Sequence, residues 1–191
     1  GPDLLHIDVG EDGRIAAIAD LWRAFSQTAD VYDEVELPGT GLVAFAALAF
    51  DDASASPSTL IVPTTVIGIR AGRAWKTRIR LMERPDDIAE PRPVAFGPSW
   101  SASLGPGAMD PETHDTAVRR ALEIIDSGEA QKIVVARDVV GTVPASADIR
   151  RLVRALSEEY ADTWTFSVDG IVGASPETLV TVRGGEVSAR V

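Results

Sequence analysis

The chain has 191 residues, 45% hydrophobic and 25% charged, which is typical of a folded globular protein with one good-sized core or two small ones. Its formal net charge of −11 argues against a nucleic-acid partner or an anionic membrane surface, since both bind basic faces. The absence of cysteine excludes disulfides, thiolate metal sites and a cysteine nucleophile. Because we find neither a long apolar run nor a signal-peptide pattern, we expect a cytoplasmic protein with no membrane contact. Residues 1–2 resemble the scar of a protease cleavage and are left out of the fold prediction.

The first hundred residues are predicted to be mostly strands with one helix. Apolar residues at helical spacing predict an amphipathic helix over residues 13–28, with Trp22 and Phe25 as core anchors. A polar loop is expected over residues 51–58. The predicted strands are a buried one over 42–50, one over 60–69 in which Pro63 suggests an edge or a bulge, and a half-exposed one over 73–81.

A charged, Pro-rich stretch and a Ser/Gly/Pro loop together place the best internal boundary near residues 84–109. We do not expect this boundary to separate independent domains. The strands before it would leave a sheet face uncovered, so residues 3–191 are predicted to belong to a single domain.

Asp110-Pro111-Glu112 predicts the start of a second helix, because an N-cap acid precedes Pro at the first helical position. That helix has Val118, Ala121, Leu122 and Ile125 as its buried stripe and ends at Gly128. The later predicted elements are a helix over 146–160, strands over 164–168 and 178–182, and a strand over 186–191 after a Gly184-Gly185 hairpin turn. The last strand has no turn or polar tail after it, so we expect the chain to be part of a larger domain.

The stretch from residue 131 to 140 reads Q-K-I-V-V-A-R-D-V-V and is apolar enough to be a strand inside a core. It contains Lys132, although the chain uses sixteen Arg and only one other Lys, Lys76. Arg stays charged at any working pH, whereas a desolvated Lys can lose its proton and act as a base. Lys132 is therefore a candidate general base.

A second stretch, G-A-S-P-E over residues 173–177, places Glu177 after a stiff turn. Pro176 fixes its own φ and favours an extended Ser175, so the carboxylate of Glu177 is held at little entropic cost. Such a carboxylate suits a general acid. The alternative interpretation is a solvated acid at a strand edge. No metal site is predicted within the chain.

With Q-K-I-V-V-A-R and G-A-S-P-E-T-L-V both present, the chain resembles the chorismate-utilising enzymes, in particular the isochorismate synthases. The stretch L-V-A-F-A-A-L-A-F-D is also similar to a strand of that family. The resemblance covers most of the chain but only the first half of the family's length. It implies an α+β fold with a largely antiparallel sheet flanked by helices.

By this resemblance, Lys132 falls on the general base that activates water for attack at C2 of chorismate. Glu177 falls on the general acid that protonates the departing C4 hydroxyl. The ammonia-using relatives, anthranilate and aminodeoxychorismate synthases, usually carry Gln where Lys132 stands, so the resemblance points to isochorismate synthase or salicylate synthase. The resemblance also implies Mg²⁺, with its ligands in a C-terminal half beyond residue 191, so we expect residues 1–191 alone to be inactive.

A stand-alone α+β binding module without catalysis is the competing interpretation. Against it, Val187, Ala189 and Val191 give the last strand one wholly apolar face, which needs cover from another segment.

Overall fold

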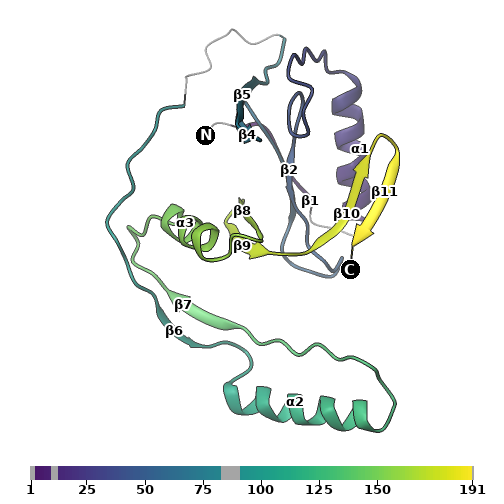
Figure 1. Ribbon diagram of the computed structural model, residues 1–191, viewed down its shortest axis with the longest axis vertical. Helices are drawn as coiled ribbons and strands as arrows, with labels where there is room; N and C mark the ends of the chain where they lie inside the picture. The colour runs from purple at the N-terminus through teal and green to yellow at the C-terminus, as the bar shows by residue number, and fades with distance from the viewer. Residues whose placement is uncertain (1–2, 10–12, 83–90, 191) are drawn as a thin grey trace. The chain divides into compact units, whose positions relative to one another are not determined.

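The computed structural model describes residues 3–9, 13–82 and 91–190 (Figure 1). The chain forms two units, one of Gly1–Val94 with Ala155–Val191 and one of Ala95–Arg154. Helices and strands are both present and every strand pair is antiparallel, which confirms the predicted α+β class. Among the described residues the strands form one three-stranded and four two-stranded sheets, not one continuous sheet.

The three-stranded sheet of the first unit has β3 (Ser58–Pro63) at its centre, between β1 (Asp3–Val9) and β2 (Phe45–Ala47). Leu60 and Val62 of β3 are buried and share one face of the sheet. The predicted buried strand over 42–50 is wrong in length and in burial, because only β2 is a strand there and its residues are exposed or half-buried. As an edge strand, β2 has a neighbour on one side only.

Helix α1 (Arg14–Gln27) confirms the first predicted helix and contacts β1 and β3. Ile18 is its buried apolar residue. Trp22 and Phe25 are half-buried, and their rings stack with centroids 6.2 Å apart. The predicted core anchors are therefore only partly covered.

Arg14, at the first position of α1, is fully buried. Its guanidinium donates to the backbone carbonyls of Asp52, Ser54 and Ser56 at 2.6, 3.0 and 2.7 Å. These three residues belong to the predicted polar loop, which the structure confirms between β2 and β3. A buried guanidinium needs such acceptors, since an unpaired buried charge is strongly destabilising.

Three hairpins make up the remaining strands of the first unit, and each turns through two residues of positive φ, as type I′ turns require. The predicted single strand over 60–69 is wrong, because the chain breaks at Thr64 into two strands and Pro63 ends the first. The hairpin strands are β4 (Thr65–Arg70) with β5 (Arg73–Arg78), β8 (Trp164–Val168) with β9 (Ile171–Ser175), and β10 (Thr178–Arg183) with β11 (Glu186–Arg190).

In the second unit, β6 (Ser103–Pro106) pairs with β7 (Val139–Thr142), and α2 (Pro111–Asp126) lies between them in sequence. The predicted cap is confirmed, because the Asp110 carboxylate accepts a hydrogen bond from the Thr113 amide at 2.8 Å. Strand β6 lies within the Ser/Gly/Pro loop that the sequence predicted near residues 84–109, and it corrects that prediction. Helix α3 (Arg150–Glu159) starts in this unit, four residues later than predicted.

Candidate active site

Lys132 follows α2 in the second unit, and its side chain is exposed. The prediction of a core strand over residues 131–140 is wrong for most of its length, since only β7 is a strand there. Strand β7 pairs with the four residues of β6, and residues 131–138 have no β partner among the described residues. The apolar side chain of Val134 is 80% exposed as a result. Apolar composition predicted the strand, but a strand also needs a neighbour for its hydrogen bonds.

Glu177 lies between β9 and β10 in the first unit, and its side chain is also exposed. Its backbone amide donates to the half-buried Ser175 hydroxyl at 3.1 Å. With Pro176 in between, this bond restrains the turn, and β10 begins at the next residue. The expected short, stiff connection before a strand is therefore present.

Gly173 is the first residue of G-A-S-P-E, and the packing of its neighbours explains why a glycine stands there. It pairs across the β8–β9 hairpin with Phe166. A Cβ at this position would lie 2.6 Å from the Phe166 ring, closer than carbon atoms approach without displacement. The aromatic ring covers the glycine, a cross-strand arrangement that stabilises hairpins.

The predicted base and acid belong to different units, Lys132 to Ala95–Arg154 and Glu177 to the other. Their pairing around a substrate stays a prediction.

Asp138, within the stretch that carries Lys132, forms a contact with Gly107 that the sequence did not indicate. The Asp138 carboxylate accepts from the Ala108 amide at 2.9 Å, and the Gly107 amide donates to the Asp138 carbonyl at 3.2 Å. The bond from Ala108 is the main reason that the pKa of the Asp138 carboxyl lies below its usual value. A Cβ on Gly107 would lie 2.0 Å from that carboxylate, so a larger residue would have to displace the Asp138 side chain.

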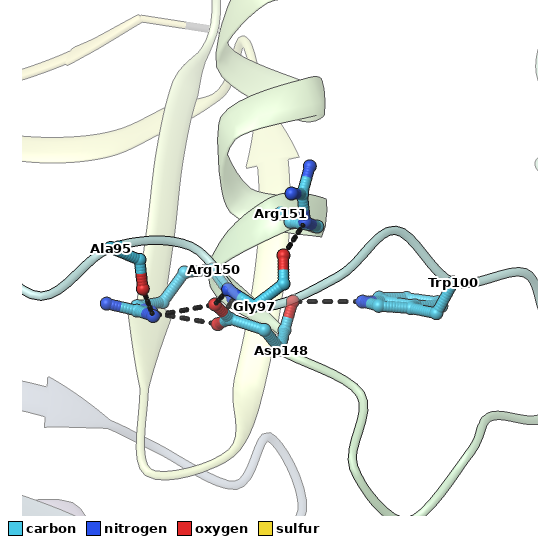
Figure 2. A network of polar contacts seen from close by, with 6 residues as sticks. All are labelled: Ala95, Gly97, Trp100, Asp148, Arg150 and Arg151. Atoms are coloured by element: carbon cyan, nitrogen blue, oxygen red, sulfur yellow. Dashed lines mark hydrogen bonds and ion pairs between the residues drawn. The ribbon is translucent and has the colours of Figure 1, made fainter.

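Asp148 ties the residues before α3 to the extended segment that begins the second unit (Figure 2). Its carboxylate accepts the Arg150 fork at 2.8 and 2.6 Å and the Gly97 amide at 2.9 Å. Its carbonyl accepts from the Trp100 indole at 3.0 Å. The bonds from Arg150, followed by that from Gly97, hold the pKa of the Asp148 carboxyl far below its usual range.

A cavity of about 380 Å³ lies in the first unit, between the end of α1, the chain after it and the end of β5. Phe25, Tyr32 and Leu42 supply part of its apolar lining, and Asp30 and Arg80 line it as well. Neither Lys132 nor Glu177 lines this cavity. It has the volume of a small-molecule site, but the predicted chemistry does not use it.

Within the described ranges, no three His, Asp or Glu side chains gather to hold a metal ion. The resemblance places the Mg²⁺ ligands beyond residue 191, so the ion stays a prediction. No helix in the same ranges is long and apolar enough to cross a membrane.

Residues 3–191 match the family described as chorismate binding enzyme. The chain belongs to this family. The match covers both units, so the stretches around Lys132 and Glu177 both lie within the matched region. Neither the curated proteins nor the solved structures gave a match.

Membership in the chorismate-binding enzymes gives this protein a chorismate-utilising function in general and chorismate as its substrate class. It does not choose among the reactions of the family. The residue at the position of Lys132 bears on that choice.

Proposed function

We propose that the protein is an isochorismate synthase, which adds water at C2 of chorismate and removes the C4 hydroxyl. The observation that carries the proposal is Lys132, which by the resemblance stands where ammonia-using relatives usually have Gln. A neutral amide cannot take a proton from water, whereas an uncharged lysine can. We also propose that the protein is cytoplasmic.

In this mechanism Lys132 Nζ takes a proton from water as the water oxygen bonds to C2. The ring double bonds shift, the C4–O bond breaks, and the Glu177 carboxyl protonates the departing hydroxyl. The ring gains one water and loses one, so the product is an isomer of the substrate. Hydroxide is a poor leaving group, which is why an acid is needed as well as a base.

The mechanism requires an uncharged lysine and a protonated glutamic acid near neutral pH. Burial favours both forms, because it penalises the charged state of each group. Lys132 and Glu177 are exposed within their own units, so their desolvation has to come from the substrate or from contacts made outside those units. We also propose that Mg²⁺, held by ligands outside the described residues, offsets the charge of the substrate.

Lys132→Gln in the protein at its full length tests the base role. We expect isochorismate formation to fall by at least roughly a hundredfold, the lower range of general-base catalysis. The matched control is Lys76→Gln, which removes the same charge from an exposed position on β5 and should leave turnover unchanged. Product analysis of the wild type should show isochorismate, and release of pyruvate with salicylate would contradict the proposed reaction. Undiminished turnover in Lys132→Gln would rule out the base role.

Glu177→Gln tests the acid role in the same assay. The amide keeps the shape of the side chain but has no carboxyl proton to give, so we expect a comparable loss of turnover. Glu186→Gln, an exposed acid on β11 of the same unit, is the control and should retain activity. Equal activity of the two variants would remove Glu177 from the mechanism.

A further inference from the structure

Three arginines from the start of α3 surround one aromatic ring in the second unit. The guanidinium carbons of Arg150, Arg151 and Arg154 lie 5.3, 5.8 and 5.6 Å from the centre of the Phe96 ring. Positions three and four apart share one face of a helix, so the three cations are concentrated on that face. Cation–π attraction to Phe96 offsets part of their mutual repulsion.

Backbone carbonyls hold two of these side chains in place (Figure 2). A terminal nitrogen of Arg150 donates to the Ala95 carbonyl at 2.9 Å, and Nε of Arg151 donates to the Gly97 carbonyl at 2.7 Å. A side chain that is already ordered loses less conformational entropy when it binds a ligand. The guanidinium groups are thus partly preorganised.

Arg150 and Arg151 differ in how their donors are used. Arg150 is neutralised by the fork that it forms with Asp148. Arg151 is half-buried, and its Nε donates to the Gly97 carbonyl. Its two terminal nitrogens have no hydrogen-bond acceptor among the described residues, and they point away from Gly97 (Figure 2). Glu158, four positions after Arg154, lowers the positive charge at that end of the face. Arg151 is therefore the donor best placed for an external anion.

We propose that Arg151, flanked by Arg154 and Phe96, binds the carboxylate or phosphate group of a small ligand. A guanidinium presents paired N–H donors that match the oxygens of either group. In a chain of net charge −11, a local group of cations is what can attract an anion, since the field of the whole protein repels it. The site is formed within the second unit and does not depend on the proposed isomerisation.

The test is calorimetric titration of the full-length protein with succinate and, separately, with inorganic phosphate, at ionic strength held constant with chloride. We expect saturable binding of one ligand per chain for at least one of the two. Binding of succinate alone would make the natural ligand a carboxylate, and binding of phosphate alone would make it a phosphorylated compound. Both outcomes support the site.

Arg151→Gln should weaken this binding by roughly tenfold or more, the loss expected for a charge-assisted fork. Arg151→Lys keeps the charge without the fork and should show an intermediate loss. Arg154→Gln is a second variant, which leaves the bond from Arg151 to Gly97 intact and should also weaken the binding.

The matched control is Arg119→Gln, which removes one positive charge from an exposed arginine of α2 in the same unit. It should bind as the wild type does. Equal weakening in Arg119→Gln and Arg151→Gln, or no saturable binding of either anion, would overturn the proposal. Because the readout is binding and not turnover, an inactive Lys132→Gln variant should still bind the anion, which separates this site from the proposed reaction.

Discussion

The two units of the chain differ in the interactions that stabilise each of them internally. The buried apolar side chains Ile18, Leu60, Val62 and Ile79 all belong to the first unit, whereas Ala121 is the one such residue of the second unit among the described residues. In the second unit, hydrogen bonds to the carboxylates of Asp138 and Asp148 join segments that are distant in sequence. Burial of apolar area is non-directional, while hydrogen bonds to a carboxylate depend on geometry and on pH.

This difference shows why the same kind of substitution should have unequal effects in the two units. Deleting an apolar side chain removes buried contacts in the first unit and little in the second. Protonating a carboxylate should instead remove hydrogen bonds mainly in the second unit.

The largest effect is expected for Leu60→Ala in β3. Leu60 is 5% exposed, so its truncation should lower the free energy of unfolding by about 3 kcal/mol through lost burial and the cavity left behind. Leu104→Ala in β6 of the second unit is the control, because Leu104 is 71% exposed, and it should change that free energy by less than about 0.5 kcal/mol. Urea denaturation of the full-length protein measures both, and equal effects would contradict the comparison.

Arg14→Lys should lower the free energy of unfolding by about 2 kcal/mol, since hydrogen bonds from a charged donor to buried carbonyls are lost. The charge is kept, so the loss reports on the three-carbonyl contact with the loop after β2. Arg23→Lys, at an exposed position of the same helix, should be nearly neutral in the same denaturation experiment. A neutral Arg14→Lys would show that the guanidinium does not hold the loop.

Gly173→Ala should destabilise by about 1 to 2 kcal/mol, because the added methyl group has to displace the Phe166 ring. Gly105→Ala in β6 is the control, since a Cβ there meets no atom within 4 Å, and it should be neutral or slightly stabilising. Thermal unfolding followed by circular dichroism distinguishes the two. A stable Gly173→Ala with unchanged Phe166 packing would remove the structural reason for this glycine.

Lowering the pH is expected to change the stability of the protein least. The pKa of Asp148 is lowered in the folded chain, so its contribution to stability is present above the ordinary aspartate pKa of about 3.9. That contribution is lost as the pH falls through the lowered value. The NMR shift of the Gly97 amide, which donates to this carboxylate, should titrate with a midpoint well below that of an ordinary aspartate.

Arg150→Gln should raise the midpoint of that titration, because the arginine fork is the largest cause of the lowered pKa. Asp148→Asn should abolish the titration altogether. A midpoint unchanged by Arg150→Gln would mean that the fork is absent in solution.

Local features of this fold were predictable because their causes lie within a few residues. Asp110 caps α2 through its own side chain, and Pro111 and Gly128 mark the two ends of that helix. The Gly184-Gly185 turn likewise needs only two residues that tolerate positive φ. The Asp169-Gly170 turn carries the same signal, yet the β9 strand after it was missed.

Features that depend on distant partners were not predictable. The contacts of Arg14 with the loop after β2, of Ala108 with Asp138, and of Gly97 with Asp148 join residues 30 to 51 positions apart, and no local signal marks them. The prediction of a strand around Lys132 was wrong for the same reason, because apolar composition does not supply a pairing partner.

The amino-acid sequence by itself determined the α+β class, the helices and the β10–β11 hairpin, and it contains the two stretches on which the resemblance to the chorismate-utilising enzymes rests. Only the tertiary structure decided which residues are buried, because burial depends on what other segments of the chain place against a side chain. It put the core around β3 and left Lys132 and Glu177 exposed within their units.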